Sequence, residues 1–136
     1  MTFYDVPIKF NSDPKLNTSD LLLERVAISP DHAIFSRQNP DETWRNVKAV
    51  DFLNEVKSLA KGLISAGIKP GDAICIMSRT RYEWTMIDFA IWFAGAVSVP
   101  IYETSSASQM EWILSDSDAV RSEERRVGKE CRSRWS

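Results

Sequence analysis

The sequence is poor in the residues from which disulfide frameworks and transition-metal sites are built. Its 136 residues include two cysteines and one histidine, and Cys131 lies in a terminal tail of distinct composition. The remaining pair, Cys75 and His32, is too small a set for a disulfide framework or a metal centre. Cys75 falls within an apolar run, which predicts a buried and unreactive thiol. His32 is expected to be an ordinary residue at a strand end, and the composition favours a reducing compartment.

Short catalytic and nucleotide-binding motifs are also missing. The sequence has no Gly-x-Gly-x-x-Gly fingerprint, no phosphate-binding P-loop motif and no Gly-x-Ser-x-Gly nucleophile elbow. Its N-terminus lacks the charged start and the apolar core of a signal peptide. The most apolar stretch, residues 89–101, is too short to span a membrane and predicts a buried helix followed by a buried strand. We therefore expect a cytoplasmic protein without a transmembrane segment.

The last sixteen residues, 121–136, differ from the rest of the chain. They carry six basic and three acidic side chains, and Val127 is their only aliphatic residue. Such a segment cannot bury enough apolar surface to offset the entropy that is lost on ordering. It resembles the in-frame translation of a sequencing-library adapter, whose codons AGA TCG GAA GAG encode the Arg-Ser-Glu-Glu of residues 121–124. We expect residues 121–136 to be a non-native tail after a truncated reading frame. The alternative is a natural basic tail that binds nucleic acid or an acidic lipid surface.

The charge balance of the remaining residues is mildly acidic. Without the tail, residues 1–120 contain 11 basic and 16 acidic side chains, a net charge of −5, compared with −2 for the whole chain. A body with this charge is typical of a soluble cytoplasmic protein and does not indicate nucleic-acid binding.

The pattern of apolar residues, glycines and prolines predicts an alternation of helices and strands. Residues 1–16 contain prolines and are expected to be an extended or poorly ordered lead-in. Asn46 is expected to cap the clearest helix, and Gly67 is expected to end it with a positive φ. The expected elements are a helix capped by residues 18–20 and ending at 28, a strand over 32–37, a short strand over 43–45, a helix over 47–65, a strand over 73–78, a helix over 81–93, a strand over 97–101, and a helix that Ser105 or Ser106 caps and residues 115–118 close.

The order of these elements predicts the fold class. Alternating helices and strands from residue 47 onwards give right-handed crossovers and a parallel sheet. The strand over 73–78 is apolar on both faces, as in a parallel strand that helices cover on both sides. We therefore expect an α/β fold, a partial three-layer parallel-sheet segment over residues 17–120. Because the tail begins where residues 119–120 would lead into a further strand, we expect no strand after the last helix and an open sheet edge.

Few residues are candidates for chemistry. Asp88 lies in a mostly apolar helix, where a buried carboxylate needs hydrogen-bond partners or a role in a site. Five aromatic residues are expected to pack in the core, the alternative being that they line an apolar pocket. They are Tyr82, Trp84, Trp92, Tyr102 and Trp112. Residues 102–106 are the best candidate for a position beside a site, because ligands bind where parallel strands end and helices begin. Their hydroxyl groups could hold an anion at a helix N-terminus or serve only as caps.

Three phrases of the sequence carry a family resemblance. Gly-Ile-Lys-Pro-Gly-Asp precedes an apolar strand at residues 67–72, Ser-Arg-Thr-Arg-Tyr-Glu-Trp follows that strand at 78–84, and Val-Pro-Ile-Tyr-Glu-Thr-Ser-Ser lies at 99–106. With the preceding helix, they resemble the N-terminal part of the AMP-forming acyl-CoA synthetases, the adenylate-forming superfamily. The resemblance covers nearly all of residues 20–120 and is closest to bacterial long-chain fatty-acid–CoA ligases, especially actinobacterial ones.

The resemblance implies an enzyme that activates a carboxylic acid in two steps. Members of this family use ATP and Mg²⁺ to form an acyl-adenylate and pyrophosphate, and the coenzyme A thiol then attacks the adenylate. A fatty acid, ATP and coenzyme A are therefore the expected partners of the parent enzyme. The phosphate loop, the adenine site and the C-terminal domain with its catalytic Lys lie downstream in the family. No catalytic, cofactor-binding or metal-binding residue is carried over, and we expect a polypeptide of these residues alone to be inactive and to bind no cofactor.

Two alternative functions remain open. The first is a small non-catalytic α/β binding module with a genuine basic tail. The second is another adenylate-forming enzyme, such as a fatty acyl-AMP ligase, an aryl-CoA ligase or a peptide-synthetase adenylation domain, because substrate pockets in the family are built mostly downstream. Peripheral membrane contact is compatible with a long acyl substrate, but no basic amphipathic helix indicates it.

Overall fold

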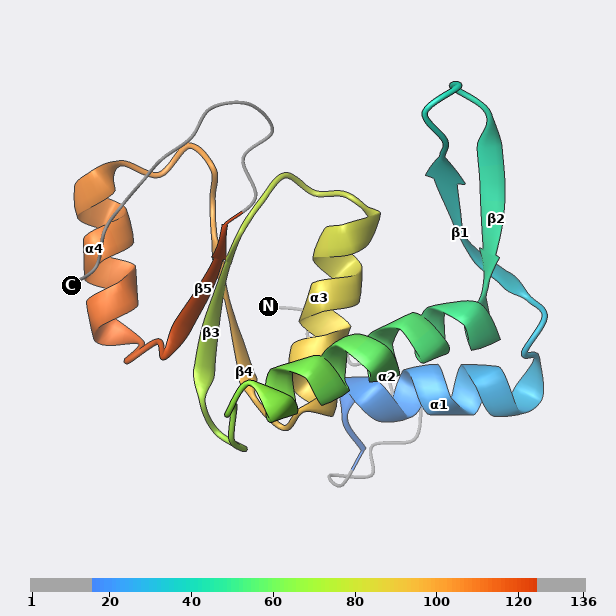
Figure 1. The fold of residues 1–136 in the computed structure, drawn as a ribbon, viewed down its shortest axis with the longest axis horizontal. Coiled ribbons are helices and arrows are strands. Elements are labelled where there is room, and N and C mark those ends of the chain that lie inside the picture. Colours follow the sequence, from blue (N-terminus) through green and yellow to red (C-terminus); the bar gives the residue numbers. More distant parts are fainter. Residues whose placement is uncertain (1–15, 125–136) are drawn as a thin grey trace, which may run out of the picture.

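A computed structural model of the chain describes residues 16–124 (Figure 1). In this range the elements are α1 (Thr18–Ile28), β1 (Ala33–Gln38), β2 (Trp44–Lys48), α2 (Ala49–Ser65), β3 (Ala73–Met77), α3 (Tyr82–Phe93), β4 (Val97–Ile101), α4 (Ala107–Asp116) and β5 (Arg121–Glu124). The order predicted from the sequence is confirmed from α1 to α4. None of the described helices has the length and apolar character that crossing a bilayer requires.

The parallel sheet has helices on both faces, so the predicted three-layer α/β arrangement is confirmed. Its strand order is β4-β3-β5, with β3 in the centre. Alternate residues of β3 point to opposite faces. Ile74 and Ile76 pack in a core with residues of α2 and α3, whereas Cys75 and Met77 pack in a second cluster with residues of α4. Figure 1 shows α2 and α3 on one side of the sheet and α4 on the other.

An aromatic cluster joins the helices to the β1–β2 hairpin. Phe52 of α2 is 1% exposed, and its ring centroid lies 4.8 Å from that of Phe35 on β1. The rings of Tyr82 and Phe89 on α3 approach Phe52 edge-on, with centroids at 5.8 and 5.6 Å. A two-stranded hairpin is marginally stable by itself, so its Phe35 anchor fixes it to the body.

Two tight turns meet at the amino end of the parallel strands. The predicted turn over residues 69–72 is confirmed, since Gly71 has φ +88° and Asp72 N–H donates to Lys69 O at 3.1 Å. Gly95, which follows α3, has φ +77°. Gly71 N–H donates to Gly95 O at 2.9 Å, and a Cβ on Gly95 would lie 3.3 Å from Pro70 Cβ. Glycine at position 95 therefore satisfies both a positive φ and a close approach.

Two predicted helix caps are wrong. Asn17 caps α1 instead of residues 18–20, because its side chain accepts from Ser19 N–H at 2.8 Å and its own N–H donates to Asp20 Oδ2 at 2.9 Å. Asn46 does not cap α2, because β2 continues beyond the predicted residue 45 to Lys48. Asn46 lies within this strand and accepts from Ser36 Oγ at 3.0 Å. The Asn46 side chain, which the sequence predicted to cap α2, is therefore used in a cross-strand hydrogen bond of the hairpin.

The expectation that no strand follows α4 is also wrong. Residues 121–124 form β5, which pairs in parallel with Ile74–Met77 of β3. Val120 N–H donates to Ala73 O at 3.0 Å and leads the chain into this register. The hydrogen bonds between strands join backbone groups and do not depend on side-chain type. A short charged segment can therefore pair with the free edge of β3, which the chain reaches after α4. The remainder of the expected tail, residues 125–136, and the expected lead-in, residues 1–15, lie outside the described residues.

Candidate functional site

A crevice opens at the carboxyl ends of β3 and β4. The chain leaves β3 toward α3 and leaves β4 toward α4, on opposite faces of the sheet (Figure 1). Adjacent parallel strands whose connections diverge in this way leave a crevice, which is the usual location for a ligand in such sheets. A hollow of about 740 Å³ lies here, lined by residues 78–80 and Trp84 from one connection and residues 100–104 from the other.

An ion pair joins the two rims of this crevice. Arg79 Nε donates to Glu103 Oε2 at 3.1 Å. The side chains are 83% and 48% exposed, so solvent screens their attraction and the pair contributes little to stability. The neighbouring Thr80 and Thr104 add hydroxyl groups, while Trp84 supplies an aromatic wall. The arrangement can therefore accommodate a ligand with both apolar and polar parts.

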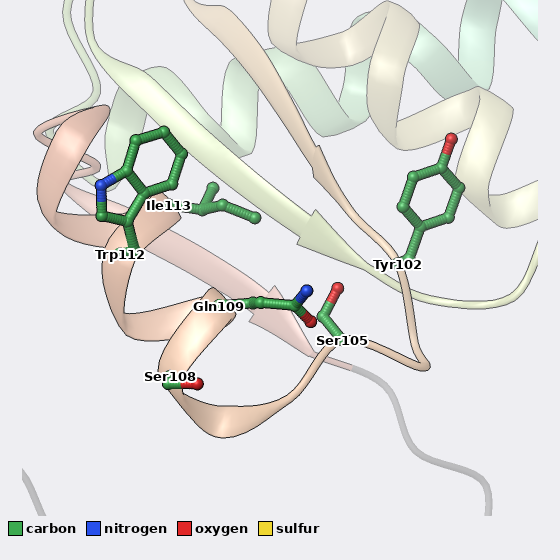
Figure 2. Close-up of a pocket in the computed structure, with 6 residues that line it drawn as sticks. All are labelled: Tyr102, Ser105, Ser108, Gln109, Trp112 and Ile113. Carbon is green, nitrogen blue, oxygen red and sulfur yellow. The ribbon is translucent and has the colours of Figure 1, made fainter.

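A second hollow, of about 430 Å³, lies beside the first on the α4 side. Figure 2 shows Tyr102 and Trp112 at opposite ends of it, with Ser105 and Gln109 between them. Tyr102 is 83% exposed and Trp112 is 65% exposed. The expectation that these two aromatic residues pack in the core is wrong, because Tyr102 lies in the loop that follows β4 and Trp112 lies on α4, which has no fully buried residue. The alternative expectation, that they line an apolar pocket, is what the structure shows.

The other three predicted core aromatics lie against the body of the domain. Tyr82 and Trp84 pack against the main core, and the Trp92 ring lies 5.2 Å from that of Phe89. Trp84 has two roles, since it also borders the crevice.

One hydroxyl group between β4 and α4 serves as a helix cap. Ser106 is the N-cap of α4: its Oγ accepts from Gln109 N–H at 3.3 Å, and its N–H donates to Gln109 Oε1 at 2.9 Å. Ser108 Oγ lies 3.0 Å from Ser106 Oγ. This capping box uses two of the free donors at the helix start. For Ser106, the structure thus favours the capping interpretation over anion binding.

Asp88 does not reach the crevice. It lies on α3 and is 7% exposed, and within residues 16–124 its Oδ1 has no hydrogen-bond partner. Burial raises the pKa of the Asp88 carboxyl, and the Ser98 side chain on β4 partly offsets this effect. Asp88 does not line either of the two hollows, so its geometry gives it a structural place between α3 and β4.

A polar network that the sequence did not reveal fixes the start of α3. Tyr82 Oη donates to Glu55 Oε2 at 2.7 Å, and Arg37 of β1 forms an ion pair with Glu83. The Arg37 guanidinium also lies 5.0 Å from the centre of the Tyr82 ring. Burial, followed by the hydrogen bond to Glu55, raises the pKa of Tyr82, which remains a neutral donor. Because these pairs join residues 27 and 46 positions apart, no local sequence pattern signals them.

The two residues considered for thiol and metal chemistry take no part in the crevice. Cys75 is fully buried, and burial raises the pKa of its thiol, as expected for an unreactive cysteine. His32 is exposed at the start of β1. In the described range, residues 16–124, no group of three or more His, Cys, Asp or Glu side chains is arranged to hold a metal ion.

The model of the family described as AMP-binding enzyme matches residues 22–121. The chain belongs to this family. The chain is 44% identical over 115 residues to the long-chain-fatty-acid–CoA ligase FadD15 of Mycobacterium bovis. The match covers 85% of the chain and 19% of FadD15, so the chain spans about a fifth of the length of this curated relative. The resemblance to adenylate-forming enzymes, and among them to an actinobacterial long-chain ligase, is confirmed.

Solved structures of two related proteins share the fold of the chain. A putative long-chain-fatty-acid CoA ligase from Rhodopseudomonas palustris superposes with a TM-score of 0.69 at 23% identity, over 79% of this chain and 26% of that one. The fatty acid AMP ligase from Legionella pneumophila gives a TM-score of 0.67 at 21% identity, over 76% and 18%. At these identities the structures show the shared fold.

Proposed function

We propose that residues 17–120 form the N-terminal part of the large domain of a long-chain fatty-acid–CoA ligase. The observation that carries this proposal is the 44% identity to FadD15 over 115 residues. The complete enzyme would activate a long-chain fatty acid with ATP and Mg²⁺ as an acyl-adenylate and transfer the acyl group to coenzyme A. A cytoplasmic location is also proposed, because the sequence has too few cysteines for a disulfide framework.

In this enzyme the described residues supply a scaffold and one crevice, and no chemical step is assigned to them. The described range offers no carboxylate cluster for Mg²⁺, and the Ser106–Gln109 capping box uses two of the free backbone donors at the start of α4. Neither observation assigns a ligand for ATP or Mg²⁺ among these residues, and in the family the phosphate loop, the adenine site and the C-terminal domain lie downstream of them. We accordingly propose that a polypeptide of these 136 residues has no adenylation activity.

An exchange assay tests the absence of activity. The purified polypeptide, incubated with palmitate, ATP and labelled pyrophosphate, is expected to give no labelled ATP above a no-enzyme control, while FadD15 in the same buffer gives strong exchange. Exchange that co-purifies with the polypeptide through two different chromatographic steps would overturn this proposal.

The identity of the acid and of the final product is tested on the complete gene product. With palmitate, ATP and coenzyme A we expect palmitoyl-CoA and AMP. Accumulation of palmitoyl-adenylate without thioester would instead indicate a fatty acyl-AMP ligase, and activity restricted to aryl acids would indicate an aryl-CoA ligase.

We also propose that residues 121–136 are a non-native tail. The family match ends at Arg121, and the composition changes at the same residue, which together support this boundary. Genomic DNA amplified across codon 120 is expected to continue with an apolar, strand-like run in the ligase frame. If the native gene contains the sixteen tail codons, the proposal is wrong.

A further inference from the structure

A polar hollow lies on the β1–β2 hairpin, close to its turn. It has a volume of about 560 Å³ and is lined by Arg37 and Gln38 of β1, by Asn39 and Pro40 of the turn, and by Arg45 of β2. Figure 1 shows that this hairpin projects from the helices of the domain. None of the residues that line the hollow also lines the crevice at the ends of β3 and β4, so the hollow is a separate candidate for ligand binding.

Two arginines lie opposite each other across this hairpin. Arg37 of β1 and Arg45 of β2 are direct cross-strand partners. The Cβ atoms of such partners are about 4.5–5.5 Å apart on one face of the hairpin, where two like charges destabilise the pairing. A guanidinium group does not lose its proton in proteins, so this repulsion persists at every physiological pH. An anion bound between the two side chains would remove it.

The carboxylate beside this pair does not balance its charge. Glu83 forms an ion pair with Arg37, and Arg81 Nε also lies 3.5 Å from Glu83 Oε2. One carboxylate is thus shared by two guanidinium groups, and Arg81 Nε has no hydrogen-bond partner among residues 16–124. Arg45 is exposed and forms no ion pair in the same range. Positive charge is therefore in excess at the hollow.

The other polar groups of the hairpin turn bond to one another. Asp41 Oδ1 accepts from Thr43 N–H at 3.1 Å and from Thr43 Oγ1 at 2.6 Å. Asn39 Nδ2 donates to Thr43 Oγ1 at 3.0 Å, and Gln38 Nε2 donates to Glu42 O at 3.4 Å. Neither Asp41 nor Glu42 forms an ion pair with an arginine in the part of the chain that the structure describes. The two arginines are therefore the groups of the hollow that have donors to offer.

The chemistry of two guanidinium groups favours a phosphate group as the ligand. Each guanidinium has five N–H donors in a planar fork. A phosphate monoester carries close to two negative charges at neutral pH and has three acceptor oxygens, so it can accept from both forks at once. A carboxylate has one charge and two oxygens, which match a single fork. The charges of Arg37 and Arg45 also act together at Tyr82, where both oppose the rise in its pKa that burial and Glu55 cause.

We propose that Arg37 and Arg45 form a binding site for a phosphate monoester group on the β1–β2 hairpin. Soluble phosphate esters and the headgroup of phosphatidic acid both present this group, and binding to each is measured separately. The assignment does not depend on the proposed ligase function.

Titration of the 136-residue chain with glycerol phosphate, followed by the NMR signals of the arginine side-chain N–H groups, tests the soluble source. We expect saturable binding that Arg45→Gln weakens at least about tenfold, because charged hydrogen bonds to the phosphate are lost. Arg45→Lys keeps the charge without the fork and is expected to weaken binding about threefold or more. The matched control is Arg25→Gln, which removes the same charge from an exposed position of α1 and is expected to change the affinity less than about twofold.

Co-sedimentation with phosphatidylcholine vesicles that contain phosphatidic acid tests the lipid source. Vesicles of equal charge that contain phosphatidylglycerol, a phosphate diester, are the control. If the lipid headgroup is the ligand, we expect retention on the phosphatidic acid vesicles alone, lowered at least about threefold by Arg45→Gln and unchanged by Arg25→Gln. Far-UV circular dichroism checks that the variants are folded. The proposal is overturned if neither glycerol phosphate nor phosphatidic acid binds, or if Arg45→Gln and Arg25→Gln weaken binding equally.

Discussion

Removal of the Phe52 ring is expected to destabilise the domain more than removal of a ring at its surface. Phe52 is 1% exposed and forms edge or tilted contacts with the rings of Phe35, Tyr82 and Phe89. Phe52→Ala removes the buried ring and leaves a cavity that the surrounding helices fill only in part. Such substitutions cost about 3–5 kcal/mol.

This cost is a large share of the stability of a domain, which is about 5–15 kcal/mol in total. The effect has two sources, because the ring is both a core residue of α2 and the anchor of Phe35 on the hairpin. Phe52→Leu keeps most of the apolar volume and is expected to cost about 0.5–3 kcal/mol, which keeps the measurement within range if the alanine variant unfolds.

Urea denaturation of the 136-residue chain, followed by circular dichroism, measures these differences. The matched control is Trp44→Ala, which removes an aromatic ring that is 67% exposed on the same hairpin and is expected to change stability by about 0.5 kcal/mol or less. If Phe52→Ala and Trp44→Ala lower the unfolding midpoint equally, the aromatic cluster does not hold the domain together and the described core is wrong.

Three further predictions concern a buried carboxylate, a cap and a turn. Burial raises the pKa of Asp88 above its usual 3.8, so the stability of the wild type should fall as pH rises from 3.8 through the pKa of the folded protein. Asp88→Asn should remove this pH-dependent loss of stability. A constant difference in stability between the two proteins from about pH 3 to 7 would refute the prediction. Ser106→Ala should lower stability by about 1 kcal/mol in thermal unfolding, whereas Ser108→Ala, two positions after the cap, should change it by less than half as much. Equal effects would rule out the capping role. Gly95→Ala introduces a Cβ at φ +77° and 3.3 Å from Pro70, and should cost about 1–3 kcal/mol by urea denaturation; a neutral effect would show that this turn is not constrained.

The fold was predictable where local patterns and tertiary structure agree. The four buried residues of β3 read as a continuous apolar run, and Gly67 and Gly71 take the positive φ values that their turns require. The sequence left two candidates, Ser105 and Ser106, for the N-cap of α4. The reciprocal hydrogen bonds between Ser106 and Gln109 identify Ser106 as the cap. These features depend on neighbours within a few residues and therefore leave a signal in the sequence.

The misassigned features depend on partners that are distant in the sequence. Asn46 has the chemistry of a cap but pairs with Ser36 across the hairpin. The network of Tyr82, Glu55 and Arg37 joins three elements, and no pattern within any one of them indicates it. β5 forms because β3 has a free edge, and a backbone ladder requires little of the side chains that enter it.

For the candidate site, topology was more informative than residue type. The prediction that residues 102–106 lie beside a site follows from strand order alone, and the structure places Tyr102 at the junction of two hollows. The exposure of Tyr102 and Trp112 could not be predicted, because aromatic residues are buried in most sequence contexts.

The hydrogen bond from Gly71 to Gly95 makes the two ends of the parallel sheet differ in how their loops are held together. At the amino end, this bond joins the turn before β3 to the turn before β4. Gly71 and Gly95 both have a positive φ there, and Gly95 packs closely against Pro70, so these positions tolerate little change. At the opposite end, the exposed ion pair between Arg79 and Glu103 joins the loop that follows β3 to the loop that follows β4. A side chain added at Gly95 would therefore disturb the start of both strands at once, whereas a change at the exposed ion pair would leave their pairing intact.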